Sequence, residues 1–251
     1  MATIAARPVR AVDRHANPPG RRYDHLFFSS AALLMLVTVF VGFAPSYYLA
    51  GVFRAQLPSP IIHVHGAVFS LWILLLVTQT SLVGAGRVDL HRPLGIAAFL
   101  VACLMVVLGV MAATVTLRSD RLLLSKQLLG FYVVPLSDML VFATLIYFGF
   151  RARRNVAEHK RLMYLATAAL LANPVARWPL AFIQRSSFRA SLVSDVFLVA
   201  LVIYDVWSTR RVHRATKWAG VFLLLVQFAR PLAGRTETWQ SFAGWVRNVG
   251  H

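Results

Sequence analysis

Residues 93–117 read PLGIAAFLVACLMVVLGVMAATVTL and contain no charged side chain. A helix rises 1.5 Å per residue, so a run of this length crosses the hydrocarbon core of a bilayer, which needs roughly 20 apolar residues. We predict seven such segments, at 26–51, 61–84, 93–117, 128–150, 162–183, 190–208 and 215–234. The fold class expected is all-α, a polytopic membrane protein built as a seven-transmembrane-helix bundle.

The overall composition agrees with this class. Apolar residues make up 58% of the chain and charged residues only 14%, against about 25% charged residues in soluble domains. The formal charge of +17 would suggest a nucleic-acid partner if the basic residues formed one patch. They lie instead in short runs between apolar segments, so we expect the lipid bilayer as partner and no nucleic acid.

The distribution of basic residues predicts the orientation. If the N-terminus is cytoplasmic, the cytoplasmic segments contain 16 Lys and Arg residues and the opposite segments contain 8. Cytoplasmic loops are the richer ones in membrane proteins. We therefore predict an N-in, C-out protein of a bacterial inner (plasma) membrane, with acidic lipid head groups against its cytoplasmic face.

The loops are too short for a separate domain, so three regions are expected. Residues 1–24 form a flexible basic cytoplasmic tail, 25–234 the transmembrane domain and 235–251 a short tail on the outer face. In this last tail, Trp239, Phe242 and Trp245 recur every three residues, which suits a helix lying along the membrane interface. A frayed tail is the alternative.

Polar residues within the spans predict a pocket in the outer half of the bundle. A charge at the centre of a spanning helix costs about 2.5–3.5 kcal/mol, so such residues usually face the interior and pair. Counting 1.5 Å per residue from the helix ends places several of them at one level. The expected pocket residues are His63, His65, Asp138, Asn173, Arg177, Asp195, Gln227 and Arg230.

Each pocket residue type suggests a role. Asp138 and Asp195 are candidate proton or cation acceptors, and Arg177 and Arg230 are their counter-charges or anion binders. His65 is a candidate gate or titrating group. Two acids and two bases would leave the pocket close to neutral, as a buried cluster requires. The alternative is that these polar contacts only hold neighbouring helices together.

A second polar cluster is expected at the cytoplasmic edge. It consists of Gln79, His91, Arg92, His159, Arg161 and Asp205. Neutral histidines can bind metals, but basic neighbours oppose a cation and favour an anion or an acidic lipid head group. Solvated cations that only set the topology are the alternative.

Several motifs resemble those of a group of bacterial multi-pass inner-membrane proteins of unassigned activity. They are His63-Val-His65-Gly66, Trp72, Gln79, Leu90-His91-Arg92-Pro-Leu94-Gly95 and Glu158-His159-Lys160-Arg161-Leu162-Met163. The resemblance covers residues 25–234 and implies a helical membrane protein, with no catalytic role for any residue. A fainter similarity is to di-haem membrane cytochromes, which hold haem b between histidines of facing helices. Here His63 and His65 have no histidine at matching depth on another helix.

The function expected from the sequence is binding or movement of a small solute, ion or proton, in transport or sensing. No cofactor or catalytic residue is predicted, and the sequence does not decide whether a metal is bound or whether the protein is an enzyme. The alternatives are a haem-binding or redox membrane subunit and a non-catalytic membrane assembly factor.

Overall fold

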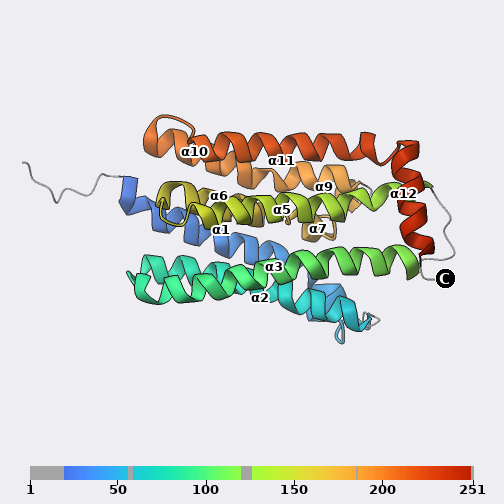
Figure 1. Ribbon diagram of the computed structural model, residues 1–251. Helices are drawn as coiled ribbons and strands as arrows, with labels where there is room; N and C mark the ends of the chain where they lie inside the picture. Colours follow the sequence, from blue (N-terminus) through green and yellow to red (C-terminus); the bar gives the residue numbers. More distant parts are fainter. Residues whose placement is uncertain (1–19, 56–58, 120–125, 185, 250–251) are drawn as a thin grey trace, which may run out of the picture.

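The computed structural model describes residues 20–55, 59–119, 126–184 and 186–249. Every regular element in these ranges is a helix, which confirms the all-α prediction (Figure 1). The elements are α1 (Gly20–Phe43), η1 (Ala44–Tyr48), α2 (Pro60–Gly84), α3 (Val88–Ser119), α4 (Lys126–Phe131), α5 (Val133–Arg151), α6 (Val156–Ala168), α7 (Ala172–Val175), α8 (Ala181–Gln184), α9 (Ser187–Ser194), α10 (Val196–Thr209), α11 (Arg214–Ala233) and α12 (Glu237–Asn248). Residues 1–19 of the expected N-terminal tail lie outside the described ranges.

The long helices run side by side along one axis, and α12 crosses one end of them (Figure 1). We call this end the α12 end. The opposite end, where α1 begins and α10 connects to α11, is the α1 end. Helix α1 packs on α2, α2 on α3, and α3 on α5, while α11 lies against α5 and α6.

Five helical segments are long and apolar enough to cross a membrane, against the seven predicted. They are Tyr23–Tyr48, Pro60–Gly84, Val88–Ser119, Lys126–Arg151 and Ser187–Thr209. The expected span 162–183 is broken into the end of α6 and the short helices α7 and α8, in a stretch that contains Pro174 and Pro179. The expected span 215–234 is one helix, but Lys217 and Arg230 lower its hydropathy.

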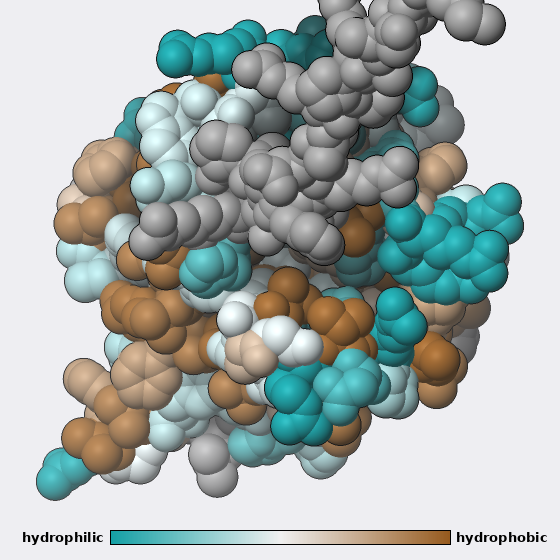
Figure 2. Space-filling view, turned by 90° about the vertical axis from the view of Figure 1, so that its left-hand side faces the viewer, coloured by the Kyte–Doolittle hydropathy of each residue, from teal (hydrophilic) through white to brown (hydrophobic). Residues whose placement is uncertain are grey.

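The outward surfaces of these helices are apolar. Leu34, Leu100 and Leu225 are 59%, 64% and 65% exposed, as in a chain whose exterior meets lipid, because soluble proteins rarely expose large apolar patches. Figure 2 looks onto the α1 end, where hydrophilic residues gather among hydrophobic ones. This surface is compatible with a membrane protein.

Small residues allow the helices to approach closely. A Cβ atom on Gly42 would lie 2.3 Å from the carbonyl oxygen of Pro174, and one on Gly109 would lie 2.3 Å from the Met139 sulfur. Helices packed in membranes use small residues in this way. The contact at Gly42 joins α1 to α7, next to the polar site described below.

Candidate functional site

A broken helix and a continuous one meet at the main polar site. Helix α6 ends at Ala168 and the chain resumes as α7 at Ala172. Asp195 lies between α9 and α10, where its N–H donates to the Ser191 carbonyl and its own carbonyl accepts from Val199, so these two helices form one helical segment. Pro174 in α7 has no N–H group and cannot donate the usual helical hydrogen bond. Such irregular backbone is tolerated at membrane depth only where protein or a water-filled cavity surrounds it.

Asp138 on α5 is the most buried acid of this site. Its side chain is 1% exposed and forms an ion pair with Arg230 of α11, whose side chain is 10% exposed. Nδ2 of Asn173 donates a hydrogen bond to the other carboxylate oxygen, at 3.1 Å. Asp138 therefore connects α5, α7 and α11, and its charge is balanced by one cation.

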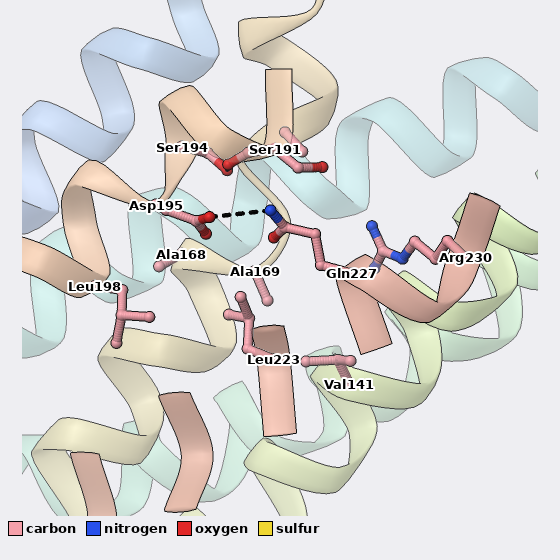
Figure 3. A pocket seen from close by; sticks show the side chains of 11 residues that line it. Val141, Ala168, Ala169, Ser191, Ser194, Asp195, Leu198, Leu223, Gln227 and Arg230 are labelled. Carbon is pink, nitrogen blue, oxygen red and sulfur yellow. Dashed lines mark hydrogen bonds between the residues drawn. The ribbon is translucent and has the colours of Figure 1, made fainter. Parts of the chain in front are cut away.

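Asp195 lies nearby with a different set of partners. Nε2 of Gln227 donates a hydrogen bond of 2.9 Å to its Oδ2 atom (Figure 3). Gln227 and Arg230 are three residues apart and share a face of α11. One helix face therefore presents an amide to Asp195 and a guanidinium group to Asp138.

A small cavity lies between Asp195, Gln227 and Arg230, with Ser191 and Ser194 also in its wall (Figure 3). The centre of a water molecule can occupy a volume of about 10 Å³ in this cavity. This is roughly the space that one bound water needs. The hydroxyl groups of Ser191 and Ser194 donate to backbone carbonyls of their own helix, at 3.1 and 2.7 Å. Their oxygens thus remain available as acceptors.

The site has one donor without an acceptor and an excess of negative charge. Nε of Arg230 is buried and has no hydrogen-bond partner among the described residues. The three charged groups, Asp138, Asp195 and Arg230, also carry one more negative than positive charge when all are ionised. Both features concern the cavity, because Asp195 and Arg230 belong to its lining.

The other residues predicted for this pocket lie outside the Asp138–Asp195 contacts. Arg177 donates from Nη1 to the backbone carbonyl of Asn173, at 2.8 Å, and its guanidinium group lies 4.6 Å from the centre of the Phe43 ring. In the described part of the chain no carboxylate lies within ion-pair distance of Arg177. Arg230 alone supplies the counter-charge for Asp138.

His63 and His65 lie on α2, beside η1 and α3 respectively. The backbone carbonyl of His63 accepts a hydrogen bond from the Tyr47 hydroxyl, at 3.1 Å. A Cβ atom on Gly66 would lie 2.9 Å from the Tyr47 ring, so the glycine of the His-Val-His-Gly motif makes room for this tyrosine. The His65 ring packs on Phe69, with ring centres 4.1 Å apart.

The residues predicted at the cytoplasmic edge form two separate groups at the α1 end. In the first, the Gln79 amide bridges α2 to α3 when its nitrogen faces His91 and its oxygen accepts from the N–H of Gly95, at 2.8 Å. The ring centres of His91 and His159 are 6.3 Å apart, and Nδ1 of His159 lies 2.8 Å from the Gly149 carbonyl oxygen. Burial lowers the pKa of His159, so the neutral imidazole is favoured.

The second group is centred on the buried pair Arg161 and Asp205, which joins α6 to α10. Thr216 of α11 also donates to Asp205. Arg92 is exposed and belongs to neither group. The predicted edge cluster is therefore one histidine group and one buried ion pair.

Sequence reasoning missed a third contact at this end. Nζ of Lys160 lies 2.6 Å from one carboxylate oxygen of Asp24, and the Tyr204 hydroxyl donates to the other at 2.5 Å. Burial lowers the pKa of Lys160, and Asp24 opposes this shift. Asp24 lies two residues before the apolar run that begins at Leu26, and this position is the sequence signal that could have indicated a partnered acid. Ser191 and Ser194 were also missed, because hydroxyl residues are common in spanning helices.

No group of three or more His, Cys, Asp or Glu side chains in the described ranges is arranged to hold a metal ion. Comparisons with known protein families, with curated proteins and with solved structures give no match for this chain.

Proposed function

We propose that this chain is a seven-helix protein of a bacterial inner membrane, N-in and C-out, which binds and moves a proton or small cation. In this proposal the broken segment 162–183 and the charged helix α11 complete the seven spans. The α12 end faces outward, so Asp138 and Asp195 lie in the outer half of the membrane. The activity is transport or sensing of the bound ion.

One observation carries the proposal: the site contains one carboxylate more than its cations balance. Arg230 is paired with Asp138, and Asp195 has only the neutral amide of Gln227. Asp195 is half-buried. A charge that is removed from water without a counter-charge is costly, and such a group normally takes up a proton or a counter-ion. Asp195 is therefore the binding group, and Asp138 with Arg230 forms a neutral support beside it.

The size of the cavity argues against a larger solute. Room for about one water molecule admits a proton or a small ion, whereas drug-sized ligands occupy about 300–1,000 Å³. The break between α6 and α7 supports the same reading, because membrane transporters place ion sites at discontinuous helices. Ala168, Ala169 and Ala172, which lie at this break, line the cavity.

Reconstituted liposomes test the proposal. With a pH-sensitive dye inside and an imposed membrane potential, we expect the full-length protein to carry protons and Asp195→Asn to lose most of that flux. Asp89→Asn is the matched control, because Asp89 is an exposed acid that pairs with Arg87. Equal flux from the wild type, Asp195→Asn and protein-free liposomes, combined with no binding of a small cation, contradicts the proposal.

A further inference from the structure

We infer that Asp195 binds a proton rather than a metal cation. This inference rests on the proposed function and names the species bound at the same site. The cavity and the hydrogen-bond partners of its lining carry the argument.

The lining groups disfavour a metal cation. A dehydrated alkali cation needs several oxygen atoms around it at short range, whereas this cavity has room for about one water molecule at ordinary hydrogen-bond distance. Gln227 directs its N–H group at Asp195, and Arg230 brings a positive charge to the same cavity. A proton on Asp195 neutralises the excess charge and needs no additional space.

The unpartnered Nε of Arg230 calls for an acceptor in the cavity. Its N–H group is a donor only, and a buried donor without an acceptor costs about 1–3 kcal/mol. An anion would satisfy it but would face two carboxylates. A water molecule can accept from Nε and adds no charge to the cavity.

The groups facing Asp195 define what can affect its protonation. The ionisable one is Arg230 on α11, which lines the cavity and pairs with Asp138 on α5. Helix α9 contributes the hydroxyl groups of Ser191 and Ser194. Helix α6 and the break before α7 contribute apolar atoms of Ala168, Ala169 and Ala172.

Labelling with dicyclohexylcarbodiimide tests which species is bound, because this apolar reagent modifies buried carboxyl groups only in their protonated form. The full-length protein in liposomes is treated at a series of pH values, with and without Na⁺, Li⁺ or K⁺, and the modified peptide is identified by mass spectrometry. We expect labelling at Asp195 to increase as the pH falls and to be unaffected by the three cations. Asp195→Asn should abolish it.

Filling the cavity tests whether its surroundings control the protonation of Asp195. In Ala168→Val and, separately, Ala169→Val, the added methyl groups bring apolar atoms into the cavity that Asp195 lines, and apolar surroundings disfavour the ionised carboxylate. The midpoint of the labelling profile should then move to higher pH, and a rise of one pH unit gives about 1.8-fold faster labelling at the wild-type midpoint. Ala229→Val adds the same groups at an exposed position of α11 and should leave the midpoint unchanged.

The possible outcomes separate the two proposals. Protection of Asp195 by a metal cation at constant pH overturns the proton inference and leaves the proposed function intact. Labelling at Asp195 that is absent or independent of both pH and cations, together with no ion flux, overturns both. An unchanged midpoint in both cavity-filling variants, with each monodisperse on size exclusion, shows that the cavity does not control the protonation of Asp195 and overturns the proton inference.

Discussion

The guanidinium group of Arg161 donates two hydrogen bonds to the same carboxylate oxygen of Asp205, from Nε at 2.9 Å and from Nη2 at 2.6 Å. The second oxygen accepts from the Thr216 hydroxyl at 2.6 Å and from the backbone N–H of His213 at 3.0 Å. The two charged side chains are 3% and 0% exposed. One carboxylate thus ties together α6, α10 and the start of α11.

Removing one partner of this pair should be worse than removing both. Arg161→Met alone leaves Asp205 buried and unpaired, and we expect a loss of about 3–5 kcal/mol in unfolding free energy. The double variant Arg161→Met with Asp205→Leu should cost less than either single change. Unfolding in mixed detergent micelles, followed by circular dichroism, measures the cycle. Additive losses would show that the two charges do not depend on each other.

His213 should make the protein sensitive to acid. Its Nδ1 accepts a hydrogen bond from the N–H of Ala215 at 3.1 Å and so caps α11. Burial lowers the pKa of His213, and the nearby charge of Arg161 lowers it further. Below a pH of about 6.5 the unfolded chain binds the proton more readily than the folded chain, so stability should fall as the pH decreases.

The variant His213→Asn separates capping from titration. Asn is a preferred N-cap residue and carries no charge at any pH. We expect its unfolding free energy to decrease less than that of the wild type between pH 7 and pH 5. Part of the remaining decrease is assigned to His159, whose pKa is also lowered by burial. Identical pH profiles for the two proteins would exclude His213 as a titrating group.

Helix depth and spacing in the sequence located much of the main site. Asp138, Asn173, Asp195, Gln227 and Arg230 were expected at one level, and the structure brings all five together. The reason is that buried charges in spanning helices must find partners. The depth of a residue in its helix therefore limits which residues can pair with it. The spacing of Gln227 and Arg230 also predicted their shared helix face.

Depth does not determine the direction in which a residue points, and this limits the prediction for Arg177. The helical count assumed one continuous helix over 162–183, whereas α6 ends at Ala168 and Arg177 follows the separate helix α7. A break in a helix changes the direction in which the side chains of all later residues point. The neutral pocket expected from the sequence counted Arg177 as a second cation. Because Arg177 makes no ion pair there, the negative charge of Asp195 is left without a counter-charge.

Glycine substitutions should have opposite effects at two positions. Gly42→Ala places a Cβ atom 2.3 Å from the backbone oxygen of Pro174, which no side-chain rotation can relieve, so α1 and α7 must separate. We expect a lower unfolding temperature and a lower yield of monodisperse protein. Gly244 lies in α12, and a Cβ atom added there would meet no described atom within 4 Å, so Gly244→Ala should stabilise by up to about 1 kcal/mol. Equal behaviour of the two variants would contradict the packing of α1 on α7.

The crossing of the membrane by α11 can be tested with single cysteines. Cys103 is the only cysteine of the chain and is exposed, so Cys103→Ala gives a cysteine-free background. Arg211→Cys and Glu237→Cys then place one exposed thiol before α11 and one after it. With seven spans and a cytoplasmic N-terminus, intact right-side-out vesicles should show labelling of position 237 by an impermeant maleimide, and of position 211 only after permeabilisation. Labelling of both positions in intact vesicles, or of neither, would place the two ends of α11 on one side and exclude α11 as a span.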